Sequence, residues 1–206
     1  RMTICNMSIE MGARGGLIAP DQTTFDYMKG RTFAPSGAAW DTKLAYWQTL
    51  YSDADAAFDL ELNIDAADIE PMITYGTNPG LGIGITKNVP TAADMQDEGE
   101  QKNLEKALQY MGLKAGHKLE GTAVDQVFIG SSTNGRIEDL REAAHVLRGR
   151  QAKIPGQVSP GSAKVKAQAE AEGLDQIFKA AGLDWVASGG SMCVGMNGDL
   201  VEKGQR

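Results

Sequence analysis

Cysteine, histidine and aromatic residues are scarce in this sequence of 206 residues, which has two cysteines, two histidines and 6% aromatic residues. Two thiols as far apart as Cys5 and Cys193 do not build the disulfide framework of a small secreted protein. We therefore expect two reduced thiols in the cytoplasm, with a secreted protein that has one long-range disulfide as the alternative. The sequence has no run of about 18 apolar residues, so no membrane span is expected.

Positive charge is also in short supply, because 20 Lys and Arg stand against 27 Asp and Glu and give a net charge of −7. This balance offers no bulk electrostatic support for binding nucleic acid. A hydrophobic content of 42% is ordinary for a soluble globular chain with a packed core. The sequence begins with Arg1 and no signal-peptide pattern follows, so we expect a piece of a longer protein.

Local patterns divide the chain into two parts. In the first part they predict helices at residues 3–13, 21–28 and 39–51, and strands at residues 17–19 and 58–64. Residues 74–90 are rich in glycine and proline and are expected to form a connection. In the second part we expect helices at residues 94–112, 137–148, 165–171 and 175–181, and strands at residues 124–129, 157–159 and 185–186. Strands that alternate with helices predict an α/β fold with mainly parallel sheets, and we place the domain boundary near Tyr75.

Two loops follow expected strands, where ligands bind in α/β proteins. Residues 130–136, Gly-Ser-Ser-Thr-Asn-Gly-Arg, open a helix whose N-terminal amides favour anions, although such residues also form ordinary caps and turns. Residues 188–193 end in Cys193, whose thiol could bind a soft metal. One cysteine cannot hold a cluster, so a purely structural loop is the alternative here.

Asn6 and Glu10 are four residues apart on the first expected helix, and this spacing puts both on one face. A carboxylate beside an amide could position a hydroxyl group and move a proton, and the alternative is a solvated stripe of polar residues. His117 in a turn and His145 on a charged helix are expected to be surface residues.

Longer stretches of the sequence resemble the aconitase family. Residues 3–14, TICNMSIEMGAR, are similar to the helix that supplies an active-site Asn and Glu in this family. Residues 19–25, APDQTTF, fit the isopropylmalate dehydratase branch better than aconitase proper. The resemblance covers essentially the whole chain in the expected order, with further matches at residues 75–80, 127–141, 160–162, 165–174 and 189–193.

The sequence departs from the family pattern at two of three cofactor positions. The family has cysteine where this chain has Ser132 and Gly190, so Cys193 is the one cluster thiolate that the sequence retains. Cys5 is usual in the family but is not a ligand. Residues 186–188 depart as well, and such clustered change indicates either engineering or relaxed constraint.

The resemblance implies two three-layer α/β segments with mainly parallel sheets, corresponding to part of the second and to the third aconitase-like domain. Residues 1–75 would carry Asn6 and Glu10, and residues 76–206 would carry the loops that bind the cluster. The family's large subunit extends beyond both ends of this chain, and a small subunit completes the site.

The resemblance also implies a hydro-lyase in which three thiolates hold a [4Fe–4S] cluster, whose open iron acts as a Lewis acid on the substrate hydroxyl. The implied reaction isomerises 2- and 3-isopropylmalate in leucine biosynthesis. A cluster bound by Cys193 alone is not expected to be stable.

Three interpretations follow. The first is a fragment of the dehydratase that is inactive in this form. The second is an aconitase or homoaconitase relative, which residues 19–25 disfavour. The third is a cofactor-free scaffold or interaction module, made by design or by decay.

We also expect self-association, because missing domains would leave apolar surface uncovered. If the resemblance holds, residues 131–136 and 189–193 must lie side by side at the carboxyl edge of one parallel sheet.

Overall fold

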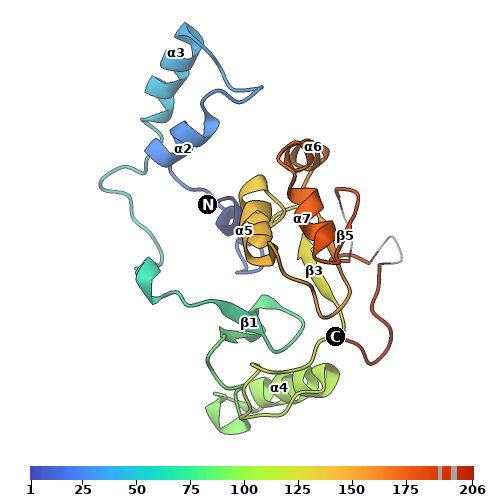
Figure 1. The fold of residues 1–206 in the computed structure, drawn as a ribbon. Coiled ribbons are helices and arrows are strands. Elements are labelled where there is room, and N and C mark those ends of the chain that lie inside the picture. Colours follow the sequence, from blue (N-terminus) through green and yellow to red (C-terminus); the bar gives the residue numbers. More distant parts are fainter. Residues whose placement is uncertain (190–191, 196–198) are drawn as a thin grey trace. The chain divides into compact units, whose positions relative to one another are not determined.

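The fold was obtained as a computed structural model that describes residues 1–189, 192–195 and 199–206. The chain divides into two compact units, Arg1–Ile69 and Glu70–Arg206, and each unit is described by itself (Figure 1). The sequence analysis placed the boundary a few residues later, near Tyr75. Among the described residues, no helix combines the length and the apolar character needed to cross a membrane.

The first unit consists of short helices and connecting segments. These are α1 (Met2–Asn6), α2 (Gln22–Met28), α3 (Ala38–Trp47) and the 3₁₀ turn η1 (Ala66–Asp68). Helix α2, which the sequence predicted at residues 21–28, begins where the Asp21 carboxylate accepts a hydrogen bond from the Thr24 amide at 3.1 Å. Trp40 of α3 is 6% exposed and meets Trp47 edge-on, with ring centroids 5.7 Å apart. Phe25 of α2, which is 4% exposed, is the other buried large side chain among residues 1–69.

Several expected elements of the first unit are not formed. Residues 17–19 and 58–64 are not strands, and α3 ends at Trp47 rather than at residue 51. Residues 1–69, all of which the structure describes, contain no strand. An alternating sequence needs a neighbouring strand to satisfy its backbone N–H and C=O groups, and this unit provides none.

The second unit begins with an antiparallel hairpin and a helix. Strand β1 (Met72–Thr74) pairs with β2 (Gly82–Gly84), which lies in the stretch that the sequence predicted to be a connection. Helix α4 (Glu98–Met111) is capped at its start by Asp97, whose carboxylate accepts a hydrogen bond from the Glu100 amide, and at its end by Gly112 in the left-handed conformation. The 3₁₀ turns η2 (Pro79–Leu81) and η3 (Ala92–Asp94) complete this part, and its core consists of Tyr75, Val89, Leu104 and Leu119.

The rest of the second unit is a parallel sheet with helices. Its strands β3 (Val127–Gly130), β4 (Gly156–Ser159) and β5 (Asp184–Trp185) run parallel in the order β3-β4-β5. Helix α5 (Ile137–Leu147) connects β3 to β4, and helices α6 (Ala163–Ala171) and α7 (Leu174–Ala180) connect β4 to β5 (Figure 1). The sequence predicted each of these six elements to within a few residues.

One core joins the sheet to its helices. Leu140 of α5, Val158 of β4 and Phe178 of α7 are each 0% exposed. Phe178 also stacks against Trp185 of β5, with ring centroids 5.7 Å apart and an interplanar angle of 9°. The predicted mixed α/β class with a parallel sheet is confirmed. Because the three strands are parallel, their carboxyl ends share one edge.

Candidate functional site

Three loops leave the carboxyl edge of the parallel sheet. Strand β3 leads into residues 131–136, β4 into residues 160–162, and β5 into residues 186–195. Residues that are far apart in the sequence converge at such an edge, which is the usual ligand-binding position in α/β proteins. The third loop is described at residues 186–189 and 192–195, so the predicted site residue Gly190 lies outside the described residues.

Ser131 of the first loop contacts the described part of the third loop. Its hydroxyl donates a hydrogen bond to Sγ of Cys193, with an Oγ–Sγ distance of 3.4 Å. The same oxygen accepts the Ser132 amide at 2.7 Å, and the Ser131 amide donates to the carbonyl oxygen of Ser159 at 3.0 Å. Ser131 has a φ of 85°. This left-handed conformation costs a non-glycine residue about 1–3 kcal/mol and persists where surrounding contacts impose it.

Ser159 connects the middle strand to both neighbouring loops. Its side chain is completely buried, and its hydroxyl donates to the Ala187 carbonyl at 3.1 Å and lies 3.5 Å from the Gly189 carbonyl. Its own carbonyl accepts the Ser131 amide. The buried hydroxyl is therefore satisfied, and a single residue bridges the first and third loops.

Two glycines allow the first loop to lie against β4 and the loop that follows it. A Cβ atom on Gly130 would lie 2.0 Å from the Ser159 carbonyl oxygen. A Cβ atom on Gly135 would lie 2.7 Å from the amide nitrogen of Gly161, which donates to the Gly135 carbonyl at 2.8 Å. Any larger side chain would force these backbones apart. The glycines that frame the Ser-Ser-Thr-Asn sequence thus have a steric role at this edge.

A charged pair on α6 holds the beginning of the third loop. Lys166 donates to the Val186 carbonyl at 3.3 Å and to the Glu170 carboxylate at 3.0 Å. The indole N–H of Trp185 donates to the same carboxylate at 2.9 Å. The pKa of Glu170 is lowered from its usual value, first by the Trp185 hydrogen bond and then by that of Lys166. Glu170 is therefore a stable anion that orients both neighbours.

The prediction that the first and third loops lie side by side at one sheet edge is confirmed by the contact between Ser131 and Cys193. Ser132 and Cys193 are both exposed there. Sequence reasoning named Ser132 but missed Ser131, Ser159 and Lys166. The position of Ser159 at the end of a predicted strand was a usable signal, because polar residues at strand ends commonly face a site.

Asn6 and Glu10 do not share a helix face, so that expectation is wrong. Asn6 is the last residue of α1, Glu10 lies in a run of turns, and both are exposed. After Asn6 the chain continues in turns, in which the Ser8 hydroxyl donates to the Ile4 carbonyl at 2.8 Å and Gly12 adopts a φ of 87°. A functional role for Asn6 and Glu10 stays a prediction.

The donors near Cys193 do not fit a [4Fe–4S] cluster. Within the described ranges, no three His, Cys, Asp or Glu side chains are grouped so that they could hold a metal ion. Ser131 and Ser132 offer neutral, hard hydroxyls, whereas iron–sulfur clusters are held by thiolates. His117 and His145 are exposed, as expected, and neither belongs to such a group.

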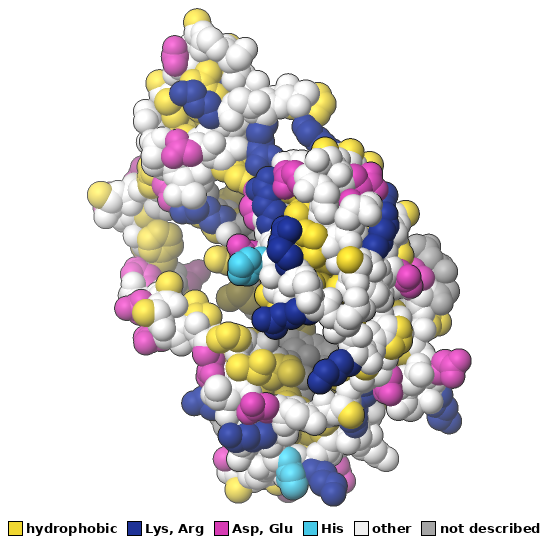
Figure 2. Space-filling model, in the orientation of Figure 1, with side chains coloured by type: hydrophobic (Ala, Val, Ile, Leu, Met, Phe, Trp, Pro, Cys, Tyr) yellow, Lys and Arg dark blue, Asp and Glu magenta, His cyan; other side chains and the backbone are white. Residues whose placement is uncertain are grey.

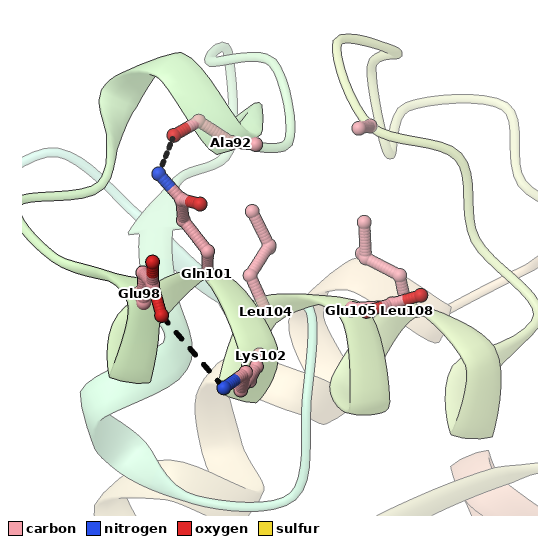
Figure 3. A pocket seen from close by; sticks show the side chains of 8 residues that line it. Ala92, Glu98, Gln101, Lys102, Leu104, Glu105 and Leu108 are labelled. Atoms are coloured by element: carbon pink, nitrogen blue, oxygen red, sulfur yellow. Dashed lines mark hydrogen bonds and ion pairs between the residues drawn. The ribbon is translucent and has the colours of Figure 1, made fainter.

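A separate pocket of about 530 Å³ lies along α4 (Figure 3). Its apolar part includes Leu104 and Leu108, which point into the space. At its rim, Lys102 lies 3.9 Å from the Glu98 carboxylate. The residues that line it include no cysteine, serine, threonine or histidine, so we do not treat it as the reaction site.

Comparison with known proteins gives two matches. The sequence profile of the Aconitase family (aconitate hydratase) matches residues 1–206. The chain is also 58% identical, over 207 aligned residues, to a Cytophaga hutchinsonii protein named 3-isopropylmalate dehydratase large subunit. That alignment covers 100% of this chain and 44% of the relative, so the chain spans less than half of the relative's length.

Proposed function

Since the chain belongs to the aconitase family, we propose that it is part of the large subunit of a hydro-lyase that interconverts 2- and 3-isopropylmalate. The main support for this proposal is the 58% identity, over the whole chain, to a protein named 3-isopropylmalate dehydratase large subunit. The reaction removes a hydroxyl and a proton from adjacent carbons as water, and water then adds back to the alkene with the opposite orientation. We place it in leucine biosynthesis in the cytoplasm, with a small subunit as partner.

In this proposal the residues of the chain fall into two groups. Asn6 positions a hydroxyl group of the substrate and Glu10 moves a proton. Their exposed polar groups and the family resemblance of residues 3–14 support these roles. The loops at the sheet edge, at residues 131–136 and 186–195, form the cofactor side of the site. We propose residues 1–75 as the domain that carries Asn6 and Glu10, and residues 76–206 as the domain that carries the cofactor loops.

We further propose that the chain is inactive in this form. The cofactor of the family would need three thiolates, and this sequence offers Ser132, Gly190 and Cys193 at the corresponding positions. A neutral hydroxyl and a residue without a side chain do not replace two thiolates as iron ligands. No catalytic step of this chain therefore passes through a cluster.

A chimeric enzyme tests both proposals. In the large subunit of Cytophaga hutchinsonii, the matching segment is replaced by this chain, and isopropylmalate turnover and iron content are measured with the small subunit present. We expect neither turnover nor a cluster. The same chimera with Ser132→Cys and Gly190→Cys is expected to recover both, and an additional Cys193→Ser change is expected to abolish both again.

Each other outcome has a defined meaning. A restored chimera that converts citrate but not isopropylmalate would favour the aconitase or homoaconitase alternative. A restored chimera that binds iron but converts no substrate would contradict the enzymatic proposal and favour a cofactor-free scaffold. Turnover by the chimera without restored cysteines would show that the proposal of inactivity is wrong.

A further inference from the structure

The carboxyl edge of the sheet is held together by bonds within the protein. Ser159 takes part in two of them: its carbonyl oxygen lies 3.0 Å from the Ser131 amide and its hydroxyl oxygen 3.1 Å from the Ala187 carbonyl. Next to this second bond, the Val186 amide donates to the Val158 carbonyl at 3.1 Å. Each loop is thus bonded to the end of β4 directly.

We propose that Ser159 is a positioning residue that holds the first and third loops in register at this edge, and that it does so without iron. The inference rests on the proposed function only for the identity of the cofactor, iron in a cluster. A structural metal makes folding depend on the metal, because its binding site rarely exists in the unfolded chain. Here a buried serine connects the two loops, since its carbonyl bonds to one of them and its hydroxyl to the other.

Ser159 also acts on the position of Cys193. Ala187 accepts the Ser159 hydroxyl and precedes Cys193 in the same loop. Ser131, whose amide is bonded to Ser159, donates its own hydroxyl to the Cys193 sulfur. The two loops are thus linked by the buried hydrogen bonds of Ser159 and, nearer the surface, by the contact between Ser131 and Cys193. Loss of the Ser159 hydroxyl should therefore increase the mobility of the third loop more than that of the first.

Hydrogen exchange of single amides in the full chain tests this role. In Ser159→Ala the hydroxyl is lost, so we expect the Val186 amide to exchange about 2- to 10-fold faster, the equivalent of one hydrogen bond. The Ser131 amide should change little, because its bond to the Ser159 carbonyl remains. Ser162→Ala is the matched control, since the exposed Ser162 hydroxyl caps α6 by accepting the Val165 amide at 3.2 Å. It should accelerate exchange at Val165 and not at Val186.

Equal acceleration at Val186 and Val165 in both variants would mean general destabilisation and would overturn the positioning role, as would unchanged exchange at Val186 in Ser159→Ala. The measurement is repeated with a chelator and with ferrous iron plus sulfide, and we expect no change at Val186 in either case. Slower exchange with iron and sulfide would overturn the claim of iron independence. These results do not depend on turnover, so they separate this inference from the proposed enzymatic function.

Discussion

The Ser131 hydroxyl lies 3.4 Å from the sulfur of Cys193, although the two residues are 62 positions apart in the sequence. They belong to the loops after β3 and β5, the two outer strands of the sheet, and β4 lies between these strands. The proposed cofactor side of the site requires the two loops to be adjacent, and in this chain a hydroxyl and a thiol make that contact. The same geometry yields the following predictions.

The purified chain is expected to be colourless after anaerobic incubation with iron and sulfide, because Ser132 and Gly190 occupy two of the three proposed positions of cluster thiolates. Iron content and visible absorption after desalting are the measurements. The variant with Ser132→Cys and Gly190→Cys should take up iron, and a further Cys193→Ser change should prevent this. A stoichiometric, stable cluster in the unchanged chain would contradict the prediction.

Ser131→Gly is expected to be more stable than Ser131→Ala by about 1 kcal/mol in the free energy of unfolding. Both variants lose the hydroxyl that contacts Cys193, so their difference reports the cost of a φ of 85° in alanine minus the larger unfolded-state entropy of glycine. Urea unfolding curves of the two variants measure this difference. Equal stability would mean that the loop relaxes to a negative φ, which would remove the argument for an imposed conformation at this residue.

Asp175→Asn is expected to lower stability near neutral pH, and this effect should shrink in acid. Asp175 is 5% exposed, and its carboxylate accepts hydrogen bonds from Lys179 at 2.8 Å and Gln176 at 2.7 Å. These bonds, that of Lys179 foremost, lower the pKa of Asp175 below its ordinary value of 3.8. The unfolded chain therefore binds this proton more readily. The ionised Asp175 carboxylate therefore stabilises the fold above pH 3.8, and this contribution is lost as the pH falls through the pKa of Asp175 in the folded state.

The measurement is the free energy of unfolding of the parent and of Asp175→Asn at several pH values between about 7 and 3. Asp184→Asn is the control, because Asp184 is an exposed carboxylate of β5 and its loss changes the net charge by the same amount. A difference between parent and Asp175→Asn that stays constant down to the lowest pH would show that the ion pair with Lys179 does not stabilise the fold.

The chain is expected to self-associate through exposed apolar side chains of its first unit. Figure 2 shows hydrophobic side chains at the surface among charges of both signs. Leu60 and Leu62 are 75% and 70% exposed in a segment that pairs with no strand of its unit. Exposed apolar segments with strand-like alternation tend to find partners. Leu60→Glu combined with Leu62→Glu should reduce dye binding and shift sedimentation toward the monomer.

Asn63→Glu is the control for this prediction, because it adds negative charge to the same exposed segment without removing apolar surface. It should change dye binding much less than the double leucine variant. A parent chain that sediments strictly as a monomer and binds no dye would contradict the expectation of self-association.

Local sequence determined most of the second unit. The 3.6-residue pattern predicted α5 from residue 137, and the compact apolar stretch before Gly130 predicted β3. Such elements follow from the chain itself, because one face of each must be buried. The candidate loops were also found from sequence, since small polar residues after a strand mark its carboxyl end. The family itself was recognised from residues that lie in order along the whole chain.

Other features were decided by tertiary structure. Residues 58–64 alternate like a strand, yet their unit contains no strand with which to pair. Ser131 donates its hydroxyl to Cys193, and this contact depends on the left-handed conformation that Ser131 adopts after β3. The hydrogen bonds of Ser159 to the loops after β3 and β5 require β4 to lie between these two strands. Periodicity expresses what each segment can bury, whereas strand order and hydrogen-bond partners depend on which segments meet in the folded chain.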